Sequence, residues 1–330
     1  MFNKKYLNGG AINNFCFYKK QNIVKATYAD TTHLKFDFVE RLDKETLFNL
    51  YNKVSGKFPK YLGQDNFEYI KGNVIKNNQL NKHNILSMAQ EMAVIHSNKR
   101  NININQISID KRINLFEEVF KYYKINSYVY DYCFKWLRDN KPSFTSVFIH
   151  GDYKLNNLKF KDDNVCGVFD LEFAKFSDAS EDIAWLFSSL WGNGWNNNNQ
   201  SIFIKEYENQ TGCKINKDNL YYWNIFALVR FAVIAIQQYH NAIKRKDIEL
   251  HITGWRLKSI EKELIDLLKI NCKHLNNNTF SYNYLYNFKF FLSFSMHSLF
   301  YSIIGKKSFL NTIKHIFRGL FIYGKKIEKT

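Results

Sequence analysis

Two short apolar segments in the middle of the chain constrain its fold most, because each ends in side chains suited to catalysis. The run Val147–Ile149 predicts a buried strand that leads directly into His150 and Asp152. The run 165–169 predicts a second short strand that ends at Asp170. Polar groups at strand ends are accessible to ligands, so this region is the predicted functional site.

The side chains gathered here match what phosphoryl transfer from ATP requires. Its transition state demands little covalent chemistry from the protein, so positioning and charge neutralisation dominate. One carboxylate must orient the acceptor hydroxyl, and Asp152 suits that role. Mg²⁺ is a hard cation that takes oxygen ligands, and Asn157 and Asp170 suit that role. The alternative interpretation is a metal-free turn with solvated acidic side chains.

The order of these residues resembles that of known kinases. His150, Asp152 and Asn157 follow the spacing His-x-Asp-x-x-x-x-Asn of the protein-kinase catalytic loop. Gly151 stands where protein kinases carry Arg, and Phe-Asp-Leu-Glu at 169–172 replaces Asp-Phe-Gly. The pattern His-Gly-Asp-x-x-x-x-Asn with a later Asp-x-Glu resembles the aminoglycoside phosphotransferase and choline kinase family instead. This resemblance implies catalytic roles for His150 and Asp152.

The resemblance covers roughly residues 6–270 and implies an α+β fold, a bilobal protein-kinase-like architecture. The expected domains are a small β-rich nucleotide-binding lobe (1–72), a large helical lobe with the catalytic loop and acceptor pocket (73–275), and a basic aromatic C-terminal extension (276–330). The segments 178–186 and 223–234 resemble one branch of the family, whose domains are found fused to acyl-CoA dehydrogenases.

A turn with two glycines lies near the N-terminus, before predicted strands at 15–18 and 23–26. Gly9 and Gly10 allow backbone amides to approach a phosphate closely, and Asn13 closes the same turn. A glycine pair is equally typical of an ordinary hairpin turn. With the resemblance, we expect these three residues to bind the nucleotide.

Lys25 lies between Val24 and Ala26 in an apolar run. A lysine in a strand is commonly a solvated edge residue, but the resemblance implies the cation that binds the α- and β-phosphates. Its expected partner is a glutamate on the next helix, joined by a charge-assisted hydrogen bond. Glu45 is the predicted partner and Glu40 the alternative, because spacing cannot separate the two.

The sequence Phe-Glu-Tyr-Ile-Lys-Gly at 67–72 resembles the hinge of this family, with Lys71 where Pro is usual. The resemblance implies that Glu68, Tyr69 and Ile70 line the nucleotide base. Without it, the same residues fit an ordinary strand that ends in a glycine turn.

Helical periodicity dominates beyond the hinge. Helices are predicted at 85–96, 114–123, 128–140, 183–190, 219–238 and 255–268. Asp182 precedes one of them and is expected either to cap it or to bond to the catalytic loop. The aromatic turn 191–195 follows, where the family often builds its acceptor pocket; plain packing is the alternative.

The net charge of +17 bears on partners rather than on fold. No zinc-finger spacing or Arg-Gly-rich arm accompanies it, so specific nucleic-acid binding is not expected. The five cysteines are scattered and form neither a metal motif nor a disulfide framework. Together with the lack of a signal-peptide pattern, they predict a cytoplasmic protein.

The extension 276–330 carries eight basic residues against one acidic residue, and an apolar stripe with lysines beside it. A basic amphipathic helix of this kind can lie on an anionic membrane, or it can pack on the large lobe or a second subunit. Peripheral membrane contact is therefore a hypothesis for this segment only.

The leading hypothesis is an ATP- and Mg²⁺-dependent small-molecule kinase. The expected acceptor is a small hydroxylated compound; a strongly basic chain is poorly suited to polycationic aminoglycosides. The resemblance to the branch fused to acyl-CoA dehydrogenases implies a hydroxyacyl compound as the candidate, whose anionic groups a basic surface would attract. The alternatives are a catalytically inactive nucleotide-binding protein and a peripheral membrane kinase acting on a lipid or glycolipid hydroxyl.

Overall fold

A computed structural model describes much of the chain. The described residues are 4–7, 14–18, 23–27, 40–98, 102, 104, 107–191, 194–245 and 257–270, without the side chains of 4–7, 14–18, 25–27, 239–245 and 258. The predicted phosphate-binding residues Gly9, Gly10 and Asn13 and the extension 276–330 lie outside the described residues.

The chain divides into two compact units, which are considered separately. The first unit comprises Met1–Ile113 and Leu137–Leu228, and the second comprises Asn114–Trp136 and Val229–Thr330. The predicted lobe boundary at residue 72 falls inside the first unit, so the lobe limits stay predictions. Every candidate site residue that the structure describes belongs to the first unit.

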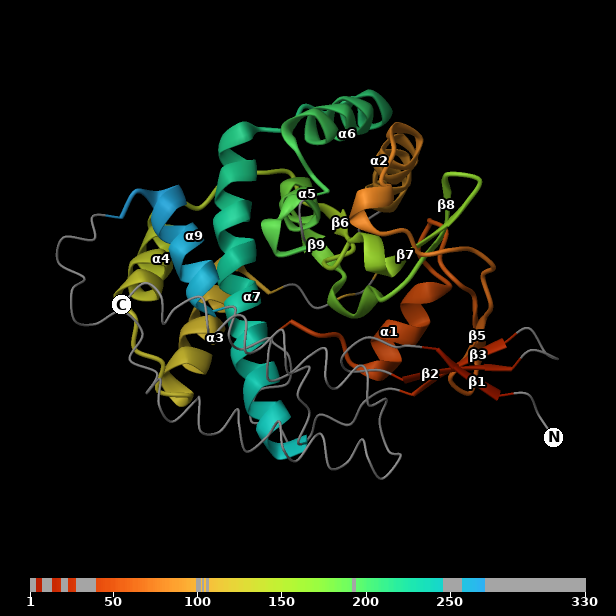
Figure 1. The fold of residues 1–330 in the computed structure, drawn as a ribbon, viewed down its shortest axis with the longest axis horizontal. Helices are drawn as coiled ribbons and strands as arrows, with labels where there is room; N and C mark the ends of the chain where they lie inside the picture. Colours follow the sequence, from red (N-terminus) through yellow and green to blue (C-terminus); the bar gives the residue numbers. More distant parts are fainter. Residues whose placement is uncertain are drawn as a thin grey trace. The chain divides into compact units, whose positions relative to one another are not determined.

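A five-stranded antiparallel sheet forms the strand-rich part of the first unit, in the order β1-β2-β3-β5-β4 (Figure 1). Its strands are β1 (Lys4–Leu7), β2 (Asn14–Tyr18), β3 (Ile23–Thr27), β4 (Tyr61–Gly63) and β5 (Asn66–Glu68). The predicted strands at 15–18 and 23–26 are thus confirmed as β2 and β3. Helix α1 (Lys44–Tyr51) follows β3, and its Phe48 ring packs edge-on against Phe67 of β5 at 5.3 Å between centroids.

The rest of the described chain is mostly helical, which confirms the α+β class. The longer helices are α2 (Lys82–His96), α3 (Ile109–Tyr122), α4 (Tyr128–Asp139), α5 (Ala179–Phe187), α6 (Asn197–Thr211), α7 (Lys217–Arg245) and α9 (Leu257–Leu268). Short 3-10 turns are η1 (Asn77–Gln79), η2 (Leu155–Asn157), η3 (Leu171–Phe173) and η4 (Ser189–Trp191).

One helix begins earlier than its sequence predicts. We expected a helix at 183–190, opened by Asp182, but α5 begins at Ala179 and Asp178 is its N-cap. The Asp178 carboxylate accepts a hydrogen bond from Ser180 N at 2.9 Å, so the first turn is closed upstream of Asp182. Asp182 therefore lies within the helix, where its side chain is free for another role.

Two small hairpin-like pairings carry the catalytic segments. Strand β6 (Val147–Ile149) pairs antiparallel with β9 (Lys175–Ser177), and β7 (Leu158–Lys161) pairs with β8 (Asn164–Val168). The predicted strands before His150 and Asp170 are confirmed as β6 and β8. Strands β7 and β9 were not predicted, because lysines interrupt their short segments and leave no continuous apolar run like that of β6.

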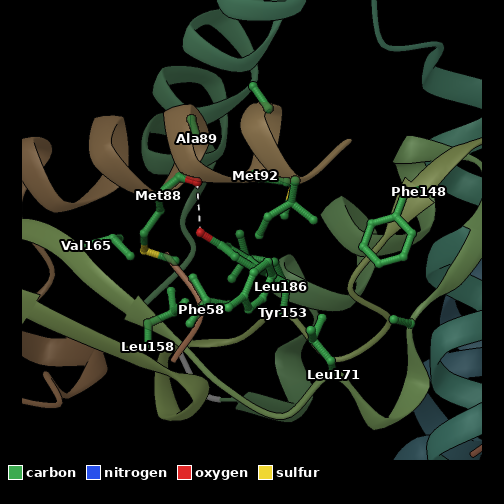
Figure 2. Packing of buried hydrophobic residues seen from close by; sticks show 14 of the residues in the cluster. Phe58, Met88, Ala89, Met92, Phe148, Tyr153, Leu158, Val165, Leu171 and Leu186 are labelled. Atoms are coloured by element: carbon green, nitrogen blue, oxygen red, sulfur yellow. Dashed lines mark hydrogen bonds between the residues drawn. The ribbon is translucent and has the colours of Figure 1, made fainter. Parts of the chain in front are cut away.

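An apolar core lies directly beneath the catalytic segment (Figure 2). Tyr153 is fully buried in it, and its hydroxyl donates a 2.9 Å hydrogen bond to the Met88 carbonyl oxygen of α2. Phe148 of β6 and Leu186 of α5 are also completely buried there. Each such side chain contributes about 1.5–3 kcal/mol on burial, so the loop between these elements rests on a rigid base.

Helix α7 is the one helix among the described residues that is long and apolar enough to cross a membrane. Most of its apolar segment Lys217–Gln238 is buried inside the protein. Core helices of soluble proteins have the same composition, so burial accounts for this apolar character.

Candidate active site

The catalytic loop begins where β6 ends, at His150. Its ring is completely buried; Nδ1 accepts a hydrogen bond from Asp152 N at 3.2 Å, and Nε2 lies 2.9 Å from the Phe169 carbonyl oxygen. Because Nδ1 accepts, Nε2 carries the proton and donates it to Phe169. Burial lowers the pKa of His150, which favours this neutral ring. The geometry therefore makes His150 a positioning residue that ties the loop to the segment before Asp170.

Gly151 explains why arginine is absent from this loop. Its φ is +78°, and a Cβ placed there would lie 2.1 Å from the Phe173 carbonyl oxygen. Any side chain would therefore be strained and would also collide with backbone. The Gly of the His-Gly-Asp pattern is required by close packing of two backbone segments.

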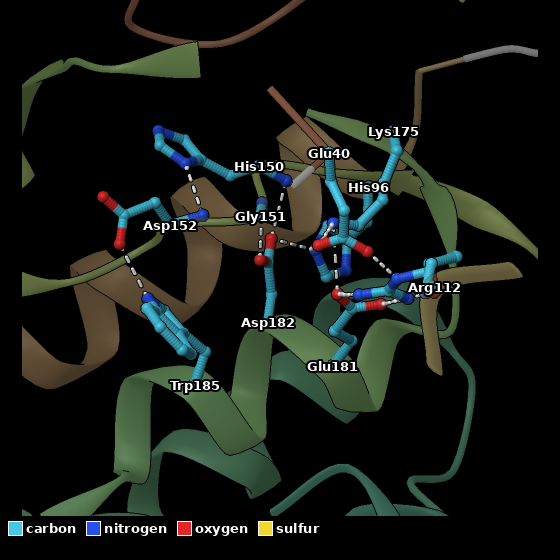
Figure 3. Close-up of polar contacts among 11 residues, drawn as sticks. Glu40, His96, Arg112, His150, Gly151, Asp152, Lys175, Glu181, Asp182 and Trp185 are labelled. Atoms are coloured by element: carbon cyan, nitrogen blue, oxygen red, sulfur yellow. Dashed lines mark hydrogen bonds and ion pairs between the residues drawn. The ribbon is translucent and has the colours of Figure 1, made fainter. Parts of the chain in front are cut away.

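Asp182, on α5, accepts hydrogen bonds from the backbone of the same loop (Figure 3). Its Oδ2 accepts from His150 N at 2.7 Å, and its Oδ1 accepts from Gly151 N at 2.8 Å. Nε2 of the buried His96 lies 3.3 Å from Oδ2 on the other side. Of the two predicted roles for Asp182, bonding to the catalytic loop is confirmed and helix capping is wrong.

The Asp152 carboxylate is held by three side chains. Lys154 Nζ lies 2.7 and 2.6 Å from its two oxygens, Asn157 Nδ2 donates to Oδ2 at 2.9 Å, and Trp185 Nε1 donates to Oδ1 at 2.7 Å. Figure 3 shows the indole of Trp185 pointing from α5 at the carboxylate. The carboxylate is thereby fixed in orientation, and an acceptor hydroxyl must compete with these donors.

Asn157 fits the predicted metal role. Its Nδ2 donates to both the carbonyl oxygen and the Oδ2 of Asp152, each at 2.9 Å. Both partners are acceptors, so the amide nitrogen must face them and the amide oxygen points away. That oxygen is the ligand type that Mg²⁺ takes.

Asp170 also fits the predicted role of a metal ligand. Burial raises the pKa of Asp170 well above its usual range, and the nearby Glu172 and Asp152 charges add to this. The Lys154 and Arg41 charges oppose this rise only in part, and no donor from the described residues hydrogen-bonds the carboxylate, so a bound cation would stabilise its charged form. No cluster of three or more His, Cys, Asp or Glu side chains suited to a metal occurs among the described residues. Mg²⁺ would therefore take its remaining ligands from phosphate oxygens and water, as it usually does.

The turn at Asp170 has an unusual backbone, and a tyrosine of α1 supports it. Asp170 has φ +73° and ψ +59°, in the left-handed region. The Tyr51 hydroxyl oxygen accepts from Asp170 N at 3.1 Å and from Leu171 N at 3.3 Å. One phenol thus satisfies two backbone donors at the point where the chain turns back.

Two acidic side chains near the site, Glu172 and Glu40, form buried ion pairs. Arg41 Nε lies 2.8 Å from Glu172 Oε2, so the second acid of the Asp-x-Glu pair is bound to an arginine. Glu40 pairs with Arg112 and, at 3.2 Å, with Lys175 (Figure 3). The Glu40 carboxylate is therefore engaged by at least these two cations, and the choice between Glu45 and Glu40 as the partner of Lys25 stays a prediction.

The nucleotide side of the site is described only in part. Lys25 lies on β3, opposite Cys16 and Asn66, but its side chain is outside the description. Glu45 is exposed in the first turn of α1, so its pairing with Lys25 stays a prediction.

The predicted hinge residues follow the edge of the sheet. Glu68 ends β5 and is exposed, and Tyr69 and Ile70 come next, half-buried. Lys159 Nζ donates to the Ile70 carbonyl oxygen at 2.7 Å and lies 4.6 Å from the centre of the Tyr69 ring. Base binding by Glu68, Tyr69 and Ile70 stays a prediction.

Sequence reasoning missed three side chains of this site: Lys154, Trp185 and Tyr51. A signal existed for Trp185, because it follows Asp182 by three helical residues and so shares its face. Lys154 lies two residues from Asp152, but lysine is so abundant in this chain that its residue type alone carries little signal. No local signal pointed to Tyr51.

Comparisons with known proteins bear on the class of protein and on the fold. Residues 67–216 match the sequence model of the phosphotransferase enzyme family. Among curated protein sequences no match is found.

Three solved structures show the same fold. A protein from Ralstonia eutropha, provisionally assigned as an aminoglycoside phosphotransferase, is 16% identical with a TM-score of 0.63 and covers 82% of this chain and 93% of its own. Choline kinase from Cryptosporidium parvum is 18% identical with a TM-score of 0.57, covering 83% and 94%. The streptomycin–ATP complex of APH(2")-IIa is 16% identical with a TM-score of 0.55, covering 82% and 93%.

The fold and the site together define a phosphotransferase with a protein-kinase-like fold. Residues 67–216 resemble the phosphotransferase enzyme family, and the chain shares its fold with an aminoglycoside phosphotransferase and a choline kinase. The more specific branch associated with acyl-CoA dehydrogenases stays a prediction.

Proposed function

We propose that the protein is an ATP-dependent kinase that transfers the γ-phosphate to a hydroxyl of a small molecule. The observation that carries the proposal is the convergence of Asp152, Asn157 and Asp170. Asn157 bonds directly to Asp152 at 2.9 Å. Its carbonyl oxygen also accepts from Phe169 N at 2.9 Å, which brings the residue before Asp170 alongside.

The chemistry assigned to these residues is an in-line displacement. The acceptor oxygen forms a bond to the γ-phosphorus, the bond from that phosphorus to the bridging oxygen of ADP breaks, and Asp152 takes the hydroxyl proton. Bound Mg²⁺ supplies charge neutralisation on the phosphates. Asn157 and Asp170 would hold it, and His150, Asp182 and Trp185 keep these groups in place.

Use of ATP is supported by similarity and by residue type. One similar structure is a complex with ATP, others hold ADP or GDP, and Lys25 occupies the strand position expected of a phosphate-binding cation. The similar structures are named for streptomycin, gentamicin and choline as acceptors or ligands. We propose a different acceptor here, a hydroxylated and anionic compound, for which a hydroxyacyl compound is the candidate.

ATP consumption across a panel of hydroxyl compounds tests the proposal, with Asp152→Asn as the blank. Loss of the general base is expected to lower turnover by about 10²–10⁴-fold. ATP binding, measured by thermal shift, should persist in the variant because Asp152 is not assigned to the nucleotide. Unchanged turnover in Asp152→Asn would refute the assignment of this residue.

A further inference from the structure

Lys154 places an ammonium group against the carboxylate that is assigned to the acceptor hydroxyl. Its Nζ lies within 2.7 Å of both oxygens of Asp152, and the side chains of the pair are only 20% and 7% exposed. An ion pair of this kind, largely shielded from water, is stronger than one on the surface. The pair therefore bears on any acceptor that approaches Asp152.

The same ammonium lies over an aromatic ring. Lys154 Nζ is 4.9 Å from the centre of the Trp191 ring. The ring is itself fixed, because Trp191 Nε1 donates to the Trp185 carbonyl oxygen at 2.7 Å. Trp185 in turn donates to Asp152 at 2.7 Å, so carboxylate and ring belong to one connected unit.

The rest of the predicted aromatic turn has another role. Trp195 is buried and packs with Phe187 and Phe203 at 5.0 and 5.7 Å between ring centres. Of the two alternatives for this turn, packing holds for Trp195, whereas Trp191 faces the Lys154–Asp152 pair.

A carboxylate combined with an aromatic face is the pair of groups with which proteins bind organic ammonium ions. Here the ammonium of Lys154 occupies the position between carboxylate and ring that a ligand ammonium would take. We infer that Lys154 excludes amine-bearing acceptors from this site and selects acceptors that carry an anionic group close to the hydroxyl. This inference rests on the proposed function, since it assumes that the acceptor hydroxyl binds at Asp152.

The selection follows from exchange of ion-pair partners. An acceptor anion offers Lys154 a second negative group, so the ammonium can turn toward it and release an oxygen of Asp152 for the hydroxyl. An acceptor ammonium offers no such exchange and meets a like charge in a partly buried site. Asp152 thus binds the acceptor hydroxyl while Lys154 pairs with the acceptor's anionic group. Both residues therefore favour an acceptor that carries an anionic group close to its hydroxyl.

The experiment compares small acceptors that differ in charge: glycolate, ethylene glycol and ethanolamine, then glycerol phosphate against choline. Turnover with ATP and Mg²⁺ is measured for the full chain, for Lys154→Gln, for Lys154→Arg and for Lys214→Gln. Lys214 is a matched control, because its 87% exposed side chain pairs with Glu208 away from the loop. Thermal shift with ATP and Mg²⁺ confirms that each variant is folded and binds nucleotide.

In the unaltered protein, kcat/KM for the anionic compounds should exceed that for the ammonium compounds by about 100-fold or more. Lys154→Gln should reduce this ratio by about tenfold or more, while Lys154→Arg and Lys214→Gln should keep it. A preference for ethanolamine or choline overturns the inference. So does a Lys154→Gln effect confined to the KM for ATP, which would assign the lysine to the γ-phosphate.

The two proposals fail in distinguishable ways. If the protein binds ATP and transfers phosphate only to neutral or cationic members of the panel, the kinase function stands and the inference about Lys154 falls. If no member, anionic ones included, is phosphorylated above the Asp152→Asn blank, the inference also falls. Absence of ATP binding by the full chain would instead refute the proposed function itself.

Discussion

The Tyr51 hydroxyl oxygen accepts hydrogen bonds from the backbone N–H groups of Asp170 and Leu171, at 3.1 and 3.3 Å. Tyr51 and Asp170 are 119 positions apart in the sequence, and Tyr51 lies at the end of α1. A side chain of one helix thereby fixes the turn that presents the proposed metal ligand. Tyr51 needs its hydroxyl for this role, whereas its ring could be replaced by that of phenylalanine.

Tyr51→Phe should therefore weaken metal use. Two partly buried backbone donors lose their acceptor, at a cost of about 1–3 kcal/mol. The Mg²⁺ concentration for half-maximal turnover should rise by about 10–100-fold, in line with loss of support around a metal ligand. Tyr61→Phe is the matched control. Tyr51 and Tyr61 both pack against the Phe67 ring, at 5.0 and 5.2 Å between ring centres, but only Tyr51 is shown bonded to the Asp170 turn. Equal Mg²⁺ dependence in both variants would contradict this role.

Gly151→Ala should destabilise the protein strongly. Backbone strain at positive φ costs about 1–3 kcal/mol, and the collision with Phe173 adds to it. Gly212→Ala is the control, since Gly212 has φ +70° with nothing within 4 Å of an added Cβ. Chemical denaturation should show the larger loss for Gly151→Ala; equal losses would mean that the contact with Phe173 relaxes freely.

Asp182→Asn should lower activity more than stability alone explains. The carboxamide can no longer offer two oxygens to His150 N and Gly151 N, and each charge-assisted bond lost costs about 1.5–3 kcal/mol. A displaced loop should reduce kcat by about 10²-fold. Turnover is compared at a temperature where the variant remains folded by circular dichroism.

The control for that variant is Asp178→Asn. Asp178 accepts from Ser180 N, Asn219 Nδ2 and Trp223 Nε1, so it is an equally embedded aspartate that does not touch the loop. It should lose stability and keep most of its kcat. If Asp178→Asn loses as much kcat as Asp182→Asn, the hydrogen bonds from the loop to Asp182 have no separate effect on catalysis.

Stability should fall in mild acid because of His150. Burial lowers the pKa of this histidine below its usual 6.5, so the unfolded chain takes up its proton first. The stabilisation from the neutral ring is complete above about pH 6.5 and is lost as the pH falls toward the lower folded pKa. The melting temperature should therefore decrease through this range. His150→Gln should reduce that dependence, whereas substitution of the exposed His83 by Gln should not.

The arrangement of the candidate catalytic residues was predictable because the requirement on them is local. Asp152 and Asn157 lie five residues apart, and the loop that joins them follows a strand with a clear apolar run. The buried face of α2 was equally predictable from the sequence, since Met88 and Met92 recur at helical spacing and are fully buried. Such patterns reflect contacts between neighbours in the chain, which sequence spacing encodes directly.

The start of α5 shows where local reasoning fails. Asp178 and Asp182 are both plausible N-caps, and only the structure shows that the first closes the helix while the second reaches the catalytic loop. Two residues of the same type thus have different roles because different backbone groups lie beside them.

The sequence by itself determined the family resemblance, the α+β class and the positions of Asp152, Asn157 and Asp170, because short-range order and residue chemistry are enough for these. Only the tertiary structure decided what surrounds them: Tyr51 beneath the Asp170 turn, Trp185 on Asp152, and Arg41 on Glu172 from 131 residues away. Contacts between distant segments depend on how buried surfaces pack, and no spacing along the chain records that packing.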